Sequence, residues 1–331
     1  MPVFQQIRRR IRRGLFVSLL ALPLLTHLAS FSASAAAAPI ALGVYTPSAP
    51  GDASKLDNYS NMVGATPAIV MWYQDWAHGE DSAFPITSMN TVASRGAMPL
   101  VTWEPWNYAN GVDQSNFSLR AIAAGQQDAY ISQWARDAAT WGKPFYIRFA
   151  HEADGTWYPW SIGVNGNSSA DYIAAWQHVV TLFRQAGATN ARWVWCVNVL
   201  YPGATPISQI YPGDAWVDWV AVDGYNWGNT QDWSTWQSLT DVFSESYNAL
   251  AALTSKPQMI AEVGSTEAGG NKANWITQGF LTDLAKRMPN VRAVIWFNEN
   301  KELDWRVNST AATIDAFKKV ATSAQFKGRL P

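Results

Sequence analysis

Two glutamates, each placed directly after an apolar, strand-like run, are the residues of this chain best suited to chemistry. Glu152 lies in the stretch FYIRFAHEADGTWYPW, and Glu262 lies in PQMIAEVGS. Cleavage of a glycosidic bond requires one carboxylic acid that protonates the leaving oxygen and one carboxylate that meets the charge developing on the sugar. Two glutamates at the ends of two strands, with tryptophan nearby, are the groups that this reaction uses.

The elements that must position these glutamates are eight short runs rich in Val, Ile, Trp, Tyr and Phe, each bounded by Gly, Pro, Asn or Asp. Such runs are typical of strands. We expect strands over Ala41–Tyr45, Ala68–Tyr73, Pro99–Trp103, Phe145–Ala150, Arg192–Val197, Trp219–Val222, Gln258–Glu262 and Val291–Phe297.

Segments with helical periodicity lie between these runs. We expect helices over Ser54–Met62, Ile86–Ser94, Ser118–Trp141, Ser169–Ala186, Thr235–Leu253, Asn274–Met288 and Thr310–Ala324. Strands that alternate with helices predict a parallel sheet, and eight of them in about 295 residues predict a single (β/α)8 TIM barrel. An open, doubly wound sheet is the alternative, but no GxGxxG or GxxxxGKS/T phosphate loop follows an early strand.

Catalytic groups of such barrels gather where the strands end at the carboxyl face. In the expected order Glu152 ends the fourth strand and Glu262 ends the seventh, on facing sides of the barrel mouth. We therefore expect carboxyl groups roughly 5 to 6 Å apart, the separation at which the second carboxylate acts as a nucleophile and the anomeric configuration is retained.

Five separated landmarks resemble glycoside hydrolase family 26, a retaining (β/α)8 family of β-glycanases. The landmarks are His151-Glu152, Trp157, Tyr225 in DGYNW, Glu262 in AEVGS and Trp296 in VIWFN, and the likeness runs from about Ile40 to Asn308. The resemblance implies that Glu152 is the acid/base and Glu262 the nucleophile. It also implies that Tyr225 hydrogen-bonds the nucleophile, and that Trp157 and Trp296 line the subsites beside the cleaved bond.

Elementary electrostatics is consistent with these implied roles. Burial among aromatic side chains would raise the pKa of Glu152, so that it holds a proton near neutral pH. Glu262 must stay ionised and needs hydrogen-bond donors, for which Tyr225 is the best candidate. Arg148 has the same alternation parity as Glu152, so we expect it to point into the barrel and support a buried carboxylate.

Four further residues at the strand ends are candidate substrate contacts. His151 either touches the sugar or supports a neighbouring side chain. Asn198 could hold a sugar hydroxyl. Trp103 and Glu104, in the stretch TWEPW, would end the third strand, where Glu104 binds substrate or makes a structural hydrogen bond rather than acting as a third catalytic acid.

The substrate is the least determined part of the prediction, because the resembled family includes β-mannanases, mixed-linkage β-1,3-1,4-glucanases and β-1,3-xylanases. Many of its mannanases carry Trp-His where this chain has Trp103-Glu104, and His-Glu-Met-Asn-Gly where it has His151-Glu152-Ala153-Asp154-Gly155. TWEPW and GTWYPW are closer to the glucan-cleaving members, so mixed-linkage glucan is favoured over mannan. A polysaccharide-binding protein without catalysis and an extracellular transglycosylase remain alternatives.

The amino terminus has the composition of a secretory signal peptide. Arginines at positions 8, 9, 10, 12 and 13 precede an apolar run over 15–28 and the small residues Ala33-Ser34-Ala35. We expect a leader over residues 1–35, with cleavage as late as about residue 38, and one catalytic domain over 39–331. The mature protein would be extracellular or periplasmic, monomeric and free of the membrane.

Charge and residue content exclude several other functions. The chain has 24 Lys+Arg and 25 Asp+Glu, and the leader removes five arginines and no acids, which leaves 19 against 25 and argues against nucleic acid as a partner. Its four histidines show no i, i+4 ligand spacing, and no GxSxG elbow is present. We therefore expect no metal and no cofactor. Nineteen tryptophans suit a ligand with apolar C–H faces, such as a sugar.

Overall fold

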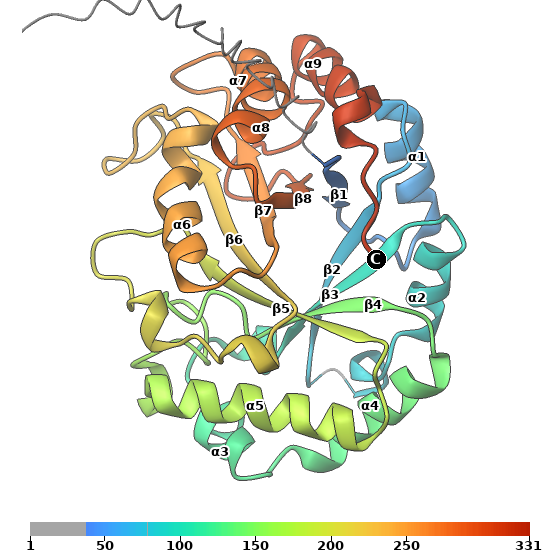
Figure 1. Ribbon diagram of the computed structural model, residues 1–331, viewed down its shortest axis with the longest axis vertical. Coiled ribbons are helices and arrows are strands. Elements are labelled where there is room, and N and C mark those ends of the chain that lie inside the picture. Colours follow the sequence, from blue (N-terminus) through green and yellow to red (C-terminus); the bar gives the residue numbers. More distant parts are fainter. Residues whose placement is uncertain (1–37, 78) are drawn as a thin grey trace, which may run out of the picture. The chain divides into compact units, whose positions relative to one another are not determined.

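The computed structural model describes residues 38–77 and 79–331, which belong to one compact unit. Within these residues, eight parallel strands close into a barrel in sequence order, with β1 paired to both β2 and β8 (Figure 1). The predicted (β/α)8 barrel is thus confirmed. The predicted signal peptide lies outside the described residues.

The strands agree with the sequence prediction and mostly extend further at their carboxyl ends. They are β1 Ala41–Tyr45, β2 Ile69–Asp75, β3 Met98–Glu104, β4 Phe145–Phe149, β5 Ala191–Asn198, β6 Trp219–Asn226, β7 Gln258–Ser265 and β8 Val291–Phe297. The polar residues that the prediction placed just after several strands are therefore hydrogen-bonded parts of the sheet.

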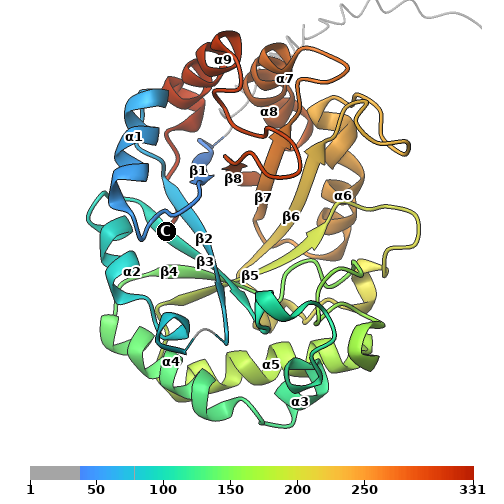
Figure 2. The same ribbon diagram turned by 180° about the vertical axis from the view of Figure 1, so that it is seen from behind.

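Helices surround the barrel (Figure 2). They are α1 Ala53–Val63, α2 Ile86–Ala93, α3 Leu119–Ala123, α4 Asp128–Trp141, α5 Ser169–Gln185, α6 Leu239–Leu253, α7 Lys272–Gln278, α8 Leu284–Arg287 and α9 Ala311–Thr322. The single helix expected over 118–141 is wrong in detail, because Gly125, with φ of 85°, separates α3 from α4. A π-helical turn over Gly279–Asp283 joins α7 to α8.

Alternation along the strands divides the apolar residues into two cores. One core fills the barrel and includes Ile69, Leu100, Tyr146 and Ile295. The other core lies between the strands and the helices. Because successive strand residues point to opposite faces, the position of a residue in this alternation decides whether its side chain can reach the barrel interior.

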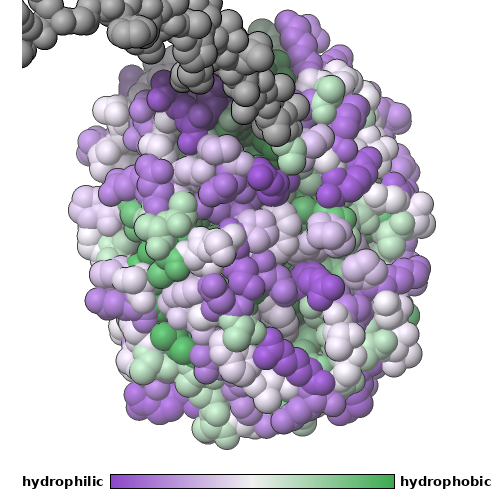
Figure 3. Space-filling view, in the orientation of Figure 1, coloured by the Kyte–Doolittle hydropathy of each residue, from purple (hydrophilic) through white to green (hydrophobic). Residues whose placement is uncertain are grey.

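The face of the molecule drawn in Figure 3 is mainly hydrophilic, and its hydrophobic residues form small, separate patches outside the area covered by grey atoms. Among the residues that the structure describes, no helix is both long and apolar enough to cross a bilayer.

Gly43 provides a direct test of the closed barrel. A Cβ atom at this position would lie 2.8 Å from Ile295 Cγ1 and 2.8 Å from Ile69 Cβ, side chains from the two strands that flank β1. We expect Gly43→Ala to lower the free energy of unfolding by about 1–3 kcal/mol, because overpacking forces neighbours out of their rotamers. The measurement is equilibrium unfolding in urea.

Gly51→Ala is the matched control, because its added Cβ would lie 3.5 Å from the nearest atom, Ser48 O, which is an ordinary contact. Both changes remove one glycine from the unfolded chain, so the difference between them isolates the barrel contact. Equal stability of the two variants would contradict the closed packing of β1 between β2 and β8.

Candidate active site

Glu262 reaches the mouth of the barrel through an irregularity in β7. Met259 and Ala261 point into the barrel, whereas Ile260 and Val263 pack against the helices. The pairing with β6 skips Ala261, since Ile260 lies opposite Val222 and Glu262 lies opposite Asp223. The extra residue has the character of a β-bulge, a device that re-aims a side chain near a functional site. Strict alternation would have turned Glu262 toward the helices.

Three donors hold the carboxylate of Glu262. Tyr73 donates its hydroxyl to Oε1 at 2.5 Å, Tyr225 donates to Oε2 at 2.5 Å, and a guanidinium nitrogen of Arg148 also donates to Oε1. Burial, together with the charge of Glu262, raises the pKa of both tyrosines well above the ordinary value, so they keep the protons that they donate. The contact from Tyr225 is the one that the family resemblance implied.

Arg148 is the cation of the barrel interior. Its side chain is fully buried and donates to Asp223 Oδ2 at 2.5 Å, to Glu262 and to the hydroxyl of Thr102 at 2.9 Å. Burial alone would lower the pKa of Arg148, but the negative charges of Asp223 and Glu262 outweigh it and raise that pKa. The guanidinium therefore stays charged and forms ion pairs with both carboxyl groups.

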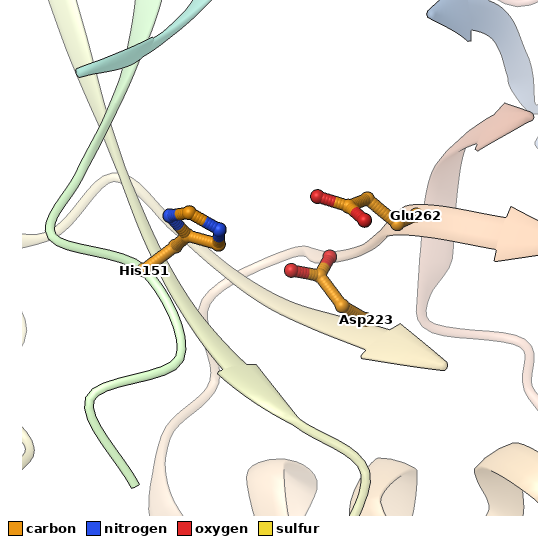
Figure 4. A group of neighbouring side chains, drawn as sticks. All are labelled: His151, Asp223 and Glu262. Atoms are coloured by element: carbon orange, nitrogen blue, oxygen red, sulfur yellow. The ribbon is translucent and has the colours of Figure 1, made fainter. Parts of the chain in front are cut away.

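His151, Asp223 and Glu262 also have the spacing of a metal site. One ligand atom of each lies within 4.8 Å of the others, and Figure 4 shows the two carboxylates from β6 and β7 pointing toward the imidazole. However, Arg148 already donates to both carboxylates. A metal ion held here would have to compete with that guanidinium for the same oxygens, so we assign the cluster to the Arg148 network.

Glu152 follows β4 in a strained part of the backbone. Ala150 and Glu152 have positive φ angles of 42° and 52°, a region that residues with a Cβ seldom occupy. The backbone N–H of Glu152 donates to Cys196 O at 2.9 Å, which ties the turn to β5. Strain of this kind persists only where surrounding contacts impose it, and it is concentrated at functional sites.

The environment of the Glu152 carboxyl differs from that of Glu262. Trp157 Nε1 donates to Oε2 at 2.7 Å, and Asn198 Nδ2 donates to Oε1 at 3.0 Å. Burial, and next the negative charge of Glu262, raise the pKa of Glu152, while the two donors lower it. The balance raises the pKa, so Glu152 holds a proton more firmly than an exposed glutamate does.

Gly155 explains how Trp157 reaches Glu152. A Cβ on Gly155 would lie 2.5–2.7 Å from atoms of the Trp157 indole, so the ring packs directly on the glycine backbone. Trp157 itself is 39% exposed, and its ring centre lies 5.9 Å from that of Tyr201. Trp157 therefore joins the catalytic carboxyl candidate to the surface.

His151 and the aromatic residues around it form a buried wall beside Glu152. The imidazole Nε2 lies 3.1 Å from the hydroxyl of Tyr158, and the ring of Tyr158 stacks on Trp160 with centres 4.4 Å apart. Burial, and next the positive charge of Arg148, lower the pKa of His151, so its imidazole is neutral. Its Nδ1 atom has no partner among the described residues.

Two further buried carboxyls lie near the candidate pair. Burial raises the pKa of Glu104 to about 8, although Trp106 Nε1 approaches it at 3.4 Å. Burial likewise raises the pKa of Asp154 to about 7, and its Oδ1 accepts the backbone N–H of Asn198 at 3.1 Å. Asp154 thus positions the residue that in turn donates to Glu152.

Two of the predicted sugar contacts are wrong. Trp103 and Trp296 are fully buried in the core between strands and helices, because their alternation parity turns them outward. Trp103 donates its indole N–H to the hydroxyl of Tyr130, on α4, at 3.1 Å. Trp296 donates to the backbone oxygen of Trp305 at 2.9 Å. Both residues support the site from behind rather than lining it.

Three residues at the site were not singled out from the sequence. Tyr73 and Asp223 share the alternation parity of inward residues on β2 and β6, so the pattern that identified Arg148 could have identified them. Trp305 packs on Tyr225 with ring centres 4.8 Å apart. It lies in the segment between β8 and α9, and no local pattern predicts that contact.

Comparisons with known proteins show what this chain is similar to. The profile described as glycosyl hydrolase family 26 matches residues 110–286. The chain is 39% identical to Endoglucanase H of Acetivibrio thermocellus over 93% of its own length and 33% of that protein. It is 27% identical to Beta-1,3-xylanase TXYA of a Vibrio species over 56% of its length and 40% of that protein. It thus spans less than half of the length of these curated relatives.

A solved structure of similar fold is that of a modular endo-β-1,4-mannanase from Cellulomonas fimi. The TM-score is 0.65 at 18% sequence identity, and the match covers 87% of this chain and 71% of the other. At this identity the likeness concerns the fold.

We expect Arg148→Met to lower the free energy of unfolding by about 3–5 kcal/mol, because it leaves Asp223 buried beside Glu262 without a cation. Adding Asp223→Asn removes one of the two uncompensated charges and should restore part of the loss. Equilibrium unfolding near neutral pH measures both. A single variant as stable as the parent, or a double variant less stable than the single one, would contradict the role given to Arg148.

Proposed function

The chain belongs to glycosyl hydrolase family 26, and from that premise we propose that it is a retaining β-glycanase in which Glu152 is the acid/base and Glu262 the nucleophile. The observation that carries the proposal is the contrast between the two carboxyls. Burial raises the pKa of Glu152, whereas Glu262 accepts hydrogen bonds from Arg148, Tyr73 and Tyr225. Such a contrast is how two carboxyls of one type acquire two roles.

In the first step Glu152 gives its proton to the glycosidic oxygen as the bond to the anomeric carbon breaks. Glu262 attacks that carbon from the opposite face and forms a covalent glycosyl-enzyme. Glu152 is then ionised, and its donors Trp157 and Asn198 stabilise this charge.

In the second step Glu152 takes a proton from water, and the resulting hydroxide attacks the anomeric carbon and releases Glu262. Two inversions at the same carbon give net retention of configuration. Arg148 and the two tyrosines donate hydrogen bonds to the Glu262 carboxylate, so they stabilise it when it leaves the anomeric carbon.

A β-linked polysaccharide is the proposed substrate, and mixed-linkage β-1,3-1,4-glucan is favoured over mannan. The relative named Endoglucanase H matches nearly the whole chain, whereas a curated mannan endo-1,4-beta-mannosidase of Caldalkalibacillus mannanilyticus is 26% identical over 53% of it. Many mannanases of the family carry a Trp-His pair where this chain has Trp103-Glu104. Glu104 is buried at the carboxyl end of β3. Its neutral form would donate a hydrogen bond that a carboxylate could not.

We also propose export to the extracellular space or the periplasm, and action there as a monomer. The arginine-rich, then apolar, amino terminus supports export. Amino-terminal sequencing of the exported protein tests this part of the proposal. The expected first residue follows a cleavage between about residues 35 and 38.

The substrate test is the release of reducing sugar by the mature protein from barley-type β-glucan, mannan, β-1,3-xylan and cellulose. The proposal expects β-glucan to be cleaved fastest. Faster release from mannan would transfer the same mechanism to a mannanase. Binding to a polysaccharide without release from any would overturn catalysis, and products longer than the starting oligosaccharide would indicate transglycosylation.

We expect Glu262→Ala to lower kcat by about ten-thousandfold or more while the fold is retained, because no other group can form the covalent intermediate. Added azide should restore part of the turnover of an aryl β-glycoside and yield a glycosyl azide of inverted configuration. Kinetics with and without azide, with circular dichroism as the control for folding, provide the measurement. Unchanged activity of this variant would remove Glu262 as the nucleophile.

The donors to Glu152 should determine the alkaline limb of the pH profile. Trp157→Phe and Asn198→Ala each remove a hydrogen bond that stabilises the ionised form, so the protonated acid should persist to higher pH. We expect the alkaline limb of kcat/KM to move upward by roughly one pH unit in each variant. The acidic limb should stay in place, and movement of the alkaline limb to lower pH would contradict the acid role of Glu152.

A further inference from the structure

A chain of aromatic rings leads from the partners of Glu262 to the surface. Tyr225, which donates to Glu262, has its ring centre 4.8 Å from that of Trp305, and Trp305 lies 5.1 Å from Trp227. Trp227 in turn lies 5.5 Å from Trp233. The inner members are buried or half-buried, whereas Trp233 is 71% exposed.

Trp233 is close enough to the catalytic candidates for one oligosaccharide to touch both. Two ring-to-ring steps, of 6.4 Å from Tyr225 to Trp227 and 5.5 Å from Trp227 to Trp233, keep the outer ring within about 12 Å of Tyr225. A single exposed tryptophan is common on protein surfaces and by itself indicates nothing. Trp233 differs from such a residue because a chain of ring contacts joins it to Tyr225, the partner of Glu262.

The segment over residues 227–238 that carries Trp233 is held by hydrogen bonds at its base. The fully buried Asn226 accepts the backbone N–H groups of Gly228 and Gln237 through its side-chain oxygen and donates to Ser265 Oγ. Ser234 Oγ donates to Gly228 O at 2.7 Å. An ordered segment loses less conformational entropy when its side chains bind a ligand.

Close approach of the neighbouring segment after β7 adds to this order. A Cβ on Gly228, whose φ is +56°, would lie 1.9 Å from Ala268 O. A Cβ on Gly270 would lie 2.2 Å from the indole of Trp236. The two segments therefore fit together only because glycine occupies both positions, and Trp233 projects from a supported surface.

We propose that Trp233, backed by Trp227, is a stacking platform for a distal sugar unit on the glycone side of the substrate. The inference rests on the proposed function. A broad indole face suits the apolar C–H face of a β-linked pyranose. Glu152 protonates the leaving oxygen, so the departing aglycone lies beside Glu152 and its partner Trp157. Trp233 connects instead to Glu262 through Tyr225. The glycone stays bound to Glu262 in the covalent intermediate, so we place Trp233 on the glycone side.

The test compares aryl β-glycosides with one aryl leaving group and either a disaccharide or a longer oligosaccharide as glycone, in the linkage that the parent protein hydrolyses fastest. Trp233→Ala should lower kcat/KM for the longer glycone by about tenfold and leave the disaccharide unchanged, because only the longer glycone reaches the platform. Trp233→Phe keeps an aromatic face and should retain most of the activity on the longer substrate.

Tyr201→Ala is the matched control. It removes a ring from the surface beside Trp157, so any change it causes should be the same for both glycone lengths. An equal loss for both substrates in Trp233→Ala, no loss for the longer one, or a parent protein that gains nothing from the longer glycone would each overturn the platform.

A binding measurement separates this inference from the proposed reaction. In the Glu262→Ala background, adding Trp233→Ala should reduce retardation during electrophoresis in a gel that contains the soluble polysaccharide. Unchanged retardation would overturn the platform while leaving catalysis intact. Loss of retardation together with a parent protein that hydrolyses no polysaccharide would overturn the proposed function and leave a sugar-binding platform.

Discussion

The arrangement of this site depends on one buried guanidinium. Arg148 has no exposed surface and binds the carboxylates of Asp223 and Glu262, which come from neighbouring strands. Burying two carboxylates together would be costly without that cation. The two ion pairs hold β4 to β6 and β7 across the barrel interior, so they fix the position of the Glu262 carboxylate.

The second carboxyl is placed by different means. Glu152 lies beyond β4, in a turn with two positive φ angles, and its donors are uncharged indole and amide groups. Without a cation of its own, Glu152 is governed by burial and by the negative charge of Glu262, and both raise its pKa. The barrel thus gives one carboxyl a charged partner and the other a weakly polar surrounding, which is the asymmetry that acid–base and nucleophilic roles need.

Much of the fold and part of the site follow from the sequence. Eight apolar runs separated by helical patterns predicted the barrel, and the alternation parity that Arg148 shares with Glu152 predicted that Arg148 points inward. Alternation along β3 and β8 would have turned Trp103 and Trp296 toward the helices. The family likeness led to the wrong face for Trp296, and the position at a strand end did so for Trp103. Glu262 shows the limit of alternation, because the extra residue Ala261 reverses its parity. Contacts such as Trp305 on Tyr225 depend on tertiary packing between distant segments, which local patterns do not encode.

The most direct measurement of the central claim is the anomeric configuration of the first product, followed by proton NMR while a β-linked oligosaccharide is being hydrolysed. Two glutamates that act in succession on one anomeric carbon predict that the β-anomer forms first and that the α-anomer grows in only by mutarotation. Initial formation of the α-anomer would show a single displacement by water and would contradict the assignment of Glu262 as a nucleophile.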